Sequence, residues 1–154
     1  KKLMKLLFKL CVVTVVTMMR NRTYTELSQL QTFYERFEYL KLEGSVGAKT
    51  FGYDRYINQI FYKSEQWLRT RNLVIVRDAG CNLGVPGMEI EGKIIVHHIR
   101  VVTLKDLEHN AAWLYDPEFL ICCSHKTHNA IHYGDPSKLE KPLINRRPGD
   151  TKLW

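Results

Sequence analysis

Histidine is absent from positions 1–96 and from positions 133–154 of this chain. All six histidines therefore lie between positions 97 and 132, and three of them fall within eight residues, in "SHKTHNAIHYGD". Cysteine is also scarce, with four residues at positions 11, 81, 122 and 123. Two of the four are adjacent, so they do not form the framework of a secreted disulfide-rich protein. Reduced thiols of the kind found inside cells are expected.

A second thiol is missing near Cys81. A zinc ribbon would need a C-x-x-C pair there, but "GCNLG" has Leu83 and Gly84 where the partner would stand. A structural zinc site that uses Cys81 and Cys122 remains an alternative.

Acidic residues are absent from the first 22 positions, which carry six of the 23 lysines and arginines. The rest of the chain then has 23 − 6 = 17 basic side chains against 16 acidic ones, a balance of +1. The formal net charge of +7 is thus mainly a property of the N-terminal stretch, and it does not by itself indicate a nucleic-acid-binding surface. With 45% hydrophobic and 25% charged residues, the composition is that of a folded globular domain.

The sequence also has no uncharged apolar run long enough for a membrane span. The longest candidate, Leu10 to Met19, is too short, and no small-x-small cleavage site follows Met19. We therefore expect no membrane partner, and we expect residues 1–18 to form an N-terminal extension outside the core. An additional β-strand or amphipathic segment is the alternative for these residues. Residues 19–154 are expected to form a single domain.

The hydrophobic spacing predicts both helices and a strand. One helix of about 18 residues is expected from Thr23, where Thr23 and Glu26 have the spacing of a capping box. A glycine- and tyrosine-rich loop should follow over 44–63, and a second helix should start after Ser64. A β-rich run over 93–99 then ends at His97 and His98, and residues 140–154 should form an extended C-terminal tail. The fold class expected is α+β.

The histidine spacing indicates a metal site. On a helix, His128 and His132 would lie one turn apart on one face, which allows both rings to bind one metal ion; a solvent-facing pair is the alternative. His97 and His98 are adjacent in a strand and should point to opposite faces. One of them can then join the metal while the other, with an ordinary pKa of about 6.5, can take a proton from water.

A strand ending in His-His, followed by a loop and a helix carrying His-x-x-x-His, resembles the HNH or ββα-metal endonucleases. The resemblance is closest to small nucleases encoded by bacteriophages and is strongest from Arg77 to Asp135, so it implies an HNH core with preceding helices and a catalytic core at about 77–135. It assigns His98 as general base and the metal ligands as His97, His128 and His132. Phe119 stands at the position of the motif asparagine that braces the loop. This task is then either lost, performed by another group such as Glu118, or performed by the backbone. His125 is a possible accessory residue.

The resemblance implies a metal-dependent hydrolase of DNA phosphodiester bonds, of the homing or DNA-packaging type, in the cytoplasm of a bacterial host cell. The alternatives are a DNA-binding module that has lost its chemistry and a purely structural zinc protein. The expected cofactor is one divalent ion, Mn²⁺, Ni²⁺, Zn²⁺ or Mg²⁺, and a ligand set without carboxylates favours Mn²⁺ or Ni²⁺ over Mg²⁺. The expected partners are DNA and phage packaging proteins, with no small-molecule cofactor. Candidate DNA contacts are Arg77, Arg100, Arg146 and Arg147.

Overall fold

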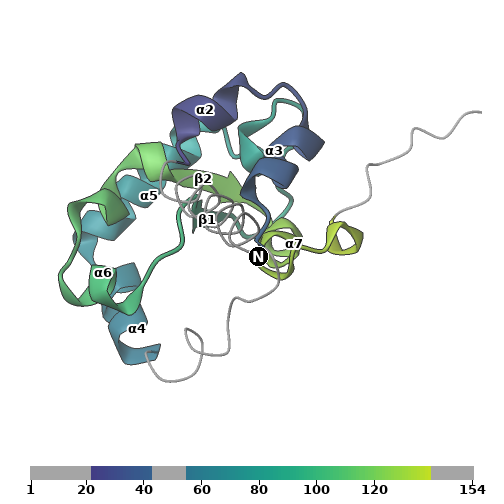
Figure 1. The fold of residues 1–154 in the computed structure, drawn as a ribbon. Coiled ribbons are helices and arrows are strands. Elements are labelled where there is room, and N and C mark those ends of the chain that lie inside the picture. The colour runs from purple at the N-terminus through teal and green to yellow at the C-terminus, as the bar shows by residue number, and fades with distance from the viewer. Residues whose placement is uncertain (1–21, 43–54, 140–154) are drawn as a thin grey trace, which may run out of the picture.

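The computed structural model describes residues 22–42 and 55–139 of the chain (Figure 1). The expected extension at 1–18, the expected tail at 140–154 and the arginines at 146 and 147 lie outside these residues. Within them, no helix has both the length and the apolar character required to cross a membrane.

Helices and a small antiparallel sheet make up the described structure, which is an α+β fold as the sequence predicts. The helices are α2 (Tyr24–Gln29), α3 (Phe33–Leu40), α4 (Arg55–Lys63), α5 (Glu65–Arg77), α6 (Leu104–Glu108) and α7 (His125–Tyr133). The strands are β1 (Ile95–His98) and β2 (Leu120–Cys123). Short 3₁₀ turns are η1 (Asn82–Gly84), η2 (Ala112–Tyr115), η3 (Pro117–Phe119) and η4 (Pro136–Lys138).

The two strands lie in the middle of the molecule (Figure 1) and pair antiparallel, with His97 opposite Ile121 and His98 opposite Leu120. A further hydrogen bond of 2.8 Å, from Ile99 N to the carbonyl of Phe119, extends the pairing beyond β1. A two-stranded sheet is marginally stable alone in water, so it must be covered on its faces.

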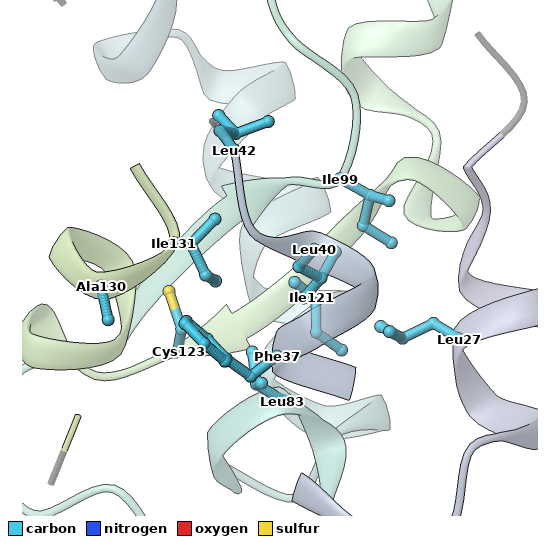
Figure 2. Close-up of a cluster of buried hydrophobic side chains, with 10 residues drawn as sticks. All are labelled: Leu27, Phe37, Leu40, Leu42, Leu83, Ile99, Ile121, Cys123, Ala130 and Ile131. Atoms are coloured by element: carbon cyan, nitrogen blue, oxygen red, sulfur yellow. The ribbon is translucent and has the colours of Figure 1, made fainter. Parts of the chain in front are cut away.

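One face of the sheet packs against α2, α3 and α7. Ile121 and Cys123 point to this side and meet Phe37, Leu40 and other buried apolar side chains (Figure 2). The other members of this cluster are Leu27, Leu42, Leu83, Ile99, Ala130 and Ile131.

The opposite face packs against α4 and α5. Val96, Leu120 and Cys122 point to this side and join a second buried cluster with Val74 and Trp67. Alternate residues of each strand thus enter different clusters, as the two-residue repeat of a β-strand requires. This alternation also decides which histidine faces which helix.

The prediction of a single helix from Thr23 is wrong, because the structure has two helices there, α2 and α3. Thr23 does cap the first helix, since its side chain accepts a hydrogen bond from Glu26 N. Thr32 then starts a new helix: its hydroxyl accepts from Glu35 N at 3.2 Å, and the Glu35 carboxylate accepts from Thr32 N at 2.9 Å. This reciprocal capping box satisfies the backbone at a new helix start and so favours the break.

The loop expected over 44–63 is also corrected in its second half, where α4 forms. The glycines that suggested a loop end at Gly52, and Arg55–Lys63 contains neither glycine nor proline. Phe61 anchors this helix, because its ring packs against Trp67 and Tyr115 at centroid distances of 5.1 and 5.2 Å. The other predicted elements are confirmed: Ser64 caps α5, the strand ends at His98, and α7 carries the His-x-x-x-His pair.

The two faces of α5 provide a matched test of the core. Val74 is fully buried against β2, whereas Val76, on the same helix, is 78% exposed. Val74→Ala should lower the free energy of unfolding by about 2 kcal/mol, from lost burial and a residual cavity, and Val76→Ala by less than about 0.5 kcal/mol. Urea denaturation of the two variants checks this, and equal losses would contradict the packing described here.

Candidate metal centre

Helix α7 carries His128 and His132, two of the three predicted metal ligands. Ser124 caps the helix by accepting a hydrogen bond from Thr127 N at 3.2 Å, and the helix ends at Gly134, which has the left-handed φ of 64°. His128 and His132 lie one turn apart inside it, and their Nε2 atoms are 3.1 Å from each other. Local helix geometry therefore brings two nitrogen ligands together without help from the rest of the fold.

β1 supplies the third histidine. His97 is buried and points toward α7, so its ring lies edge-on to His128 and His132 at centroid distances of 5.3 and 5.0 Å. One ring nitrogen from each of the three residues lies within 4.8 Å of the other two. We call His97, His128 and His132 the histidine trio. The expectation that the strand end and the helix converge on one point is confirmed.

The trio has the donor chemistry and the spacing of a transition-metal site. A tetrahedral zinc site with Zn–N distances of about 2.0–2.1 Å places its ligand atoms about 3.3–3.4 Å apart. The 3.1 Å separation of the two Nε2 atoms is close to this value. The ligand atoms of all three residues lie within 4.8 Å of one another. In the part of the chain that the structure describes, this is the single group of three or more ligand side chains so placed, and Cys81 and Cys122 do not join it.

Burial keeps the trio neutral, which is the form that binds a metal. Desolvation holds the pKa of His97 well below its ordinary value, and the neighbouring His128 and His132 lower it further. The pKa of His128 is lowered to about 4, first by desolvation and then by His132, against a hydrogen bond from Asn129 that raises it. Desolvation also lowers the pKa of His132.

His98 lies on the other face of β1, away from the trio. Its ring stacks on Trp67 at 5.2 Å and contacts Phe61 and Trp113 at 6.0 and 5.8 Å. Desolvation lowers the pKa of His98 to about 4, although a backbone hydrogen bond to Leu114 raises it in part. The residue is 6% exposed, so the aromatic side chains cover the expected general base.

The backbone orients the His98 ring. Its Nε2 lies 3.1 Å from the carbonyl oxygen of Leu114. A carbonyl can only accept a hydrogen bond, so Nε2 must carry the proton and Nδ1 must hold the lone pair in the neutral ring. Glu118, which was expected as one substitute for the motif asparagine, is bonded to α2 instead: its Oε1 accepts from Thr25 N at 2.8 Å.

Phe119 and Arg100 pack against Trp113, which contacts the His98 ring. The Arg100 guanidinium lies 4.7 Å from the Trp113 ring centroid and 5.0 Å from that of Phe119. Trp113 and Phe119 meet edge to face at 6.0 Å. Phe119, which the resemblance places at the motif asparagine, is a packing residue in this structure, and its carbonyl accepts the Ile99 N–H.

The remaining candidates are separate from the trio. Arg77 lies over the Tyr24 ring at 3.4 Å and donates hydrogen bonds to Asp78, Pro117 O and Leu120 O, so its donors are used within the fold. His125, the first residue of α7, is exposed, and its Nδ1 lies 3.4 Å from the Asn129 amide nitrogen.

Sequence reasoning missed the surroundings of His98. Trp67 is recognisable as an apolar residue of α5, but its stacking on His98 depends on how α5 crosses the sheet. The Leu114 carbonyl is a backbone group and has no signature in the sequence. Neither contact could be found from residue spacing.

In comparisons with known proteins, no family model, curated protein or solved structure matches the chain.

Metal binding to the trio should follow the ligand chemistry. We expect one Co²⁺ ion per chain, detected by its visible absorption, and little competition from Mg²⁺, because three imidazoles suit later transition metals. His132→Ala should weaken Co²⁺ binding by more than about 100-fold, since partners outside the ligand shell alone contribute roughly 10–100-fold. His125→Ala, on the same helix but outside the trio, is the control and should bind Co²⁺ like the wild type; the reverse ranking would contradict the assignment.

Buried neutral His98 should also make stability depend on pH. Its pKa is about 4 in the folded protein, against an ordinary value of about 6.5, so between these values the unfolded chain binds the additional proton. The free energy of unfolding is then fully retained above pH 6.5 and falls as the pH decreases, by roughly 2–3 kcal/mol from this residue between pH 7.5 and 4.5.

Urea denaturation at several pH values measures this dependence. His98→Gln, which keeps a donor for the Leu114 carbonyl, should remove the part of the decline that comes from His98 and leave the part that comes from the buried trio, whereas His109→Gln at an exposed site should leave the whole decline unchanged. A decline of the same size in His98→Gln would show that His98 is not its source.

Proposed function

We propose that this protein is a metal-dependent endonuclease of the HNH type that hydrolyses DNA phosphodiester bonds, of the kind encoded by bacteriophages. The observation that carries the proposal is the convergence of His97, His128 and His132 within 4.8 Å, with His98 next in sequence to one of them. The order β1, β2 and α7, with ligands from the first strand and the helix, also agrees with a ββα-metal core. DNA and phage packaging proteins are the partners in the same proposal.

In this proposal the trio supplies three neutral nitrogen ligands and leaves further coordination positions open. A divalent ion bound there would act as a Lewis acid and stabilise the negative charge that develops on the phosphate and on the departing 3′ oxygen. The buried strand position of His97 and the helical spacing of His128 and His132 hold the ligands in fixed relative positions.

His98 would take the proton from the attacking water. The hydrogen bond between its Nε2 and Leu114 O leaves Nδ1 as the basic atom, so the ring is already in the required tautomer. Of the two candidates within the described residues, Arg100 is better suited to the DNA backbone than Arg77, because the Trp113 and Phe119 rings hold its guanidinium. Arg77 is less suited, since its donors are bonded within the fold.

Two observations favour the second candidate, a DNA-binding module that keeps the metal site and has lost the chemistry. His98 is buried under Phe61 and Trp67, and Phe119 stands at the asparagine position of the motif. Catalysis by His98 requires these aromatic rings to move apart and the imidazole, which lies on the face of β1 away from the trio, to reach the attacking water, whereas metal and DNA binding alone do not.

A plasmid assay separates the two candidates. Purified protein with Mn²⁺ should convert supercoiled plasmid to the nicked form, and His98→Ala should slow this reaction by about 10²–10⁴-fold, the usual contribution of a general base. His128→Ala should also abolish nicking, by loss of a ligand. His109→Ala, at an exposed histidine bonded to Lys105 O, is the control and should retain wild-type activity.

Nicking by His98→Ala at the wild-type rate would exclude His98 as the base. Absence of nicking by the wild type, with one metal ion bound and plasmid retained in a filter-binding assay, would support the second candidate.

A further inference from the structure

The outer edge of β2 is covered by three side chains from the last residue of α5 and the segment that follows it. β2 turns one edge toward β1, while the backbone groups of Leu120, Cys122 and Ser124 point to the other edge. Arg77 Nη2 donates to Leu120 O at 2.7 Å, Asp78 Oδ2 accepts from Cys122 N at 2.8 Å, and Asn82 Oδ1 accepts from Ser124 N at 3.2 Å. We call the side chains of Arg77, Asp78 and Asn82 the edge clasp.

Asn82 is the member of the edge clasp that reaches α7. Besides accepting from Ser124 N, its Nδ2 donates to the hydroxyl of Thr127 at 2.8 Å. The amide orientation follows from chemistry, because the Ser124 N–H can only donate and must face the amide oxygen. Asn82, Ser124 and Thr127 are buried, so water does not compete for these bonds.

The turn that carries Asn82 is itself held in place. Asn82 N donates to Met88 O at 2.7 Å, and the next residue, Leu83, has a left-handed φ of 53°. Such a backbone costs a β-carbon-bearing residue on the order of 1 kcal/mol or more, and it persists where the surroundings fix it. Leu83 is fully buried, and its carbonyl accepts a 2.7 Å bond from Arg36 Nη1.

The two residues that Asn82 holds begin the helix that carries the ligands. Ser124 is the N-cap of α7, its carbonyl accepts the His128 N–H at 2.9 Å, and Thr127 directly precedes His128. From Ser124 to His132 the helix rises about 12 Å, so a tilt of about 10° at its start would displace the His132 end by about 2 Å. Metal–ligand distances tolerate deviations of only about 0.2 Å. The far end of α7 is also held, by a 2.9 Å bond from Leu42 N to Ile131 O, so the helix direction depends on this bond together with those of Asn82.

We propose that Asn82 is a positioning residue for the histidine trio: by bonding Ser124 and Thr127 it sets the direction in which α7 leaves β2, and thereby the approach of His128 and His132 to His97. This inference rests on the metal centre of the proposed function. The inference assigns a role to Asn82 although this residue does not belong to the trio and supplies no ligand atom to it.

Co²⁺ binding to the full chain tests the inference through visible absorption, independently of any nuclease activity. Asn82→Ala should lower Co²⁺ affinity by about 10–100-fold, as loss of a supporting partner does in other metal sites, and should change the absorption band. Thr127→Val, which keeps the side-chain volume but removes one of the two contacts, should give a smaller loss with the same sign. Asn72→Ala, an asparagine exposed on α5, is the matched control and should bind like the wild type.

Circular dichroism and thermal melting, measured on the same samples, separate positioning from stability. A lower melting temperature with a Co²⁺ affinity and absorption band like those of the wild type would assign Asn82 a structural role alone and would overturn the inference.

If the wild-type chain binds no Co²⁺, the proposed function fails, and amide hydrogen exchange then decides about Asn82. In Asn82→Ala, the amides of Thr127 and His128 should exchange faster, while the Asp78 amide that ends α5 should keep its rate. Equal acceleration at all three amides would overturn the inference.

Discussion

The antiparallel pairing of β1 with β2 determines where each candidate site residue lies. Because alternate residues of a strand face opposite sides, His97 points toward α7 and His98 points toward α5, although the two are neighbours in sequence. Two strands of four residues cannot maintain this arrangement alone. They are held by buried clusters on both faces and by side chains that bond the outer edge of β2. The separation of the two histidines is thus a consequence of the whole core.

The histidine trio combines two unfavourable conditions that a cation would relieve. Three imidazoles are partly or fully removed from water, and the Nε2 atoms of His128 and His132 face each other at 3.1 Å. Without an ion, these two nitrogens can share one proton, with one ring donating and the other accepting. Desolvation lowers the pKa of both rings, and the neighbouring His132 lowers that of His128 further. A divalent ion accepts lone pairs from both rings at once, so the same crowding that disfavours protons favours a metal.

The sequence predicted the parts of this site that depend on local periodicity. Four-residue spacing within α7 and alternation along β1 are properties of single elements, and both were correct. The break between α2 and α3 was missed, although the sequence contains a signal for it in Thr32 and Glu35, because the longer hydrophobic pattern continues across the break. The cover over His98 and the bonds made by Asn82 were not predictable in this way. These side-chain contacts join residues 15 or more positions apart and depend on how α5, η1 and η2 pack on the sheet.

The two candidate functions differ in what they require of His98. Burial affects both its access to water and its basicity. The aromatic cover excludes water from the ring and, by the same desolvation, lowers its pKa to about 4, which makes it a weak base at neutral pH. If Phe61 and Trp67 separate, water reaches Nδ1 and the pKa rises toward its ordinary value of about 6.5, so access and basicity would be gained in one movement. The Leu114 carbonyl already fixes the tautomer and needs no change. Metal binding by the trio is common to both functions, and it is the chemistry at His98 that separates a nuclease from a binding module.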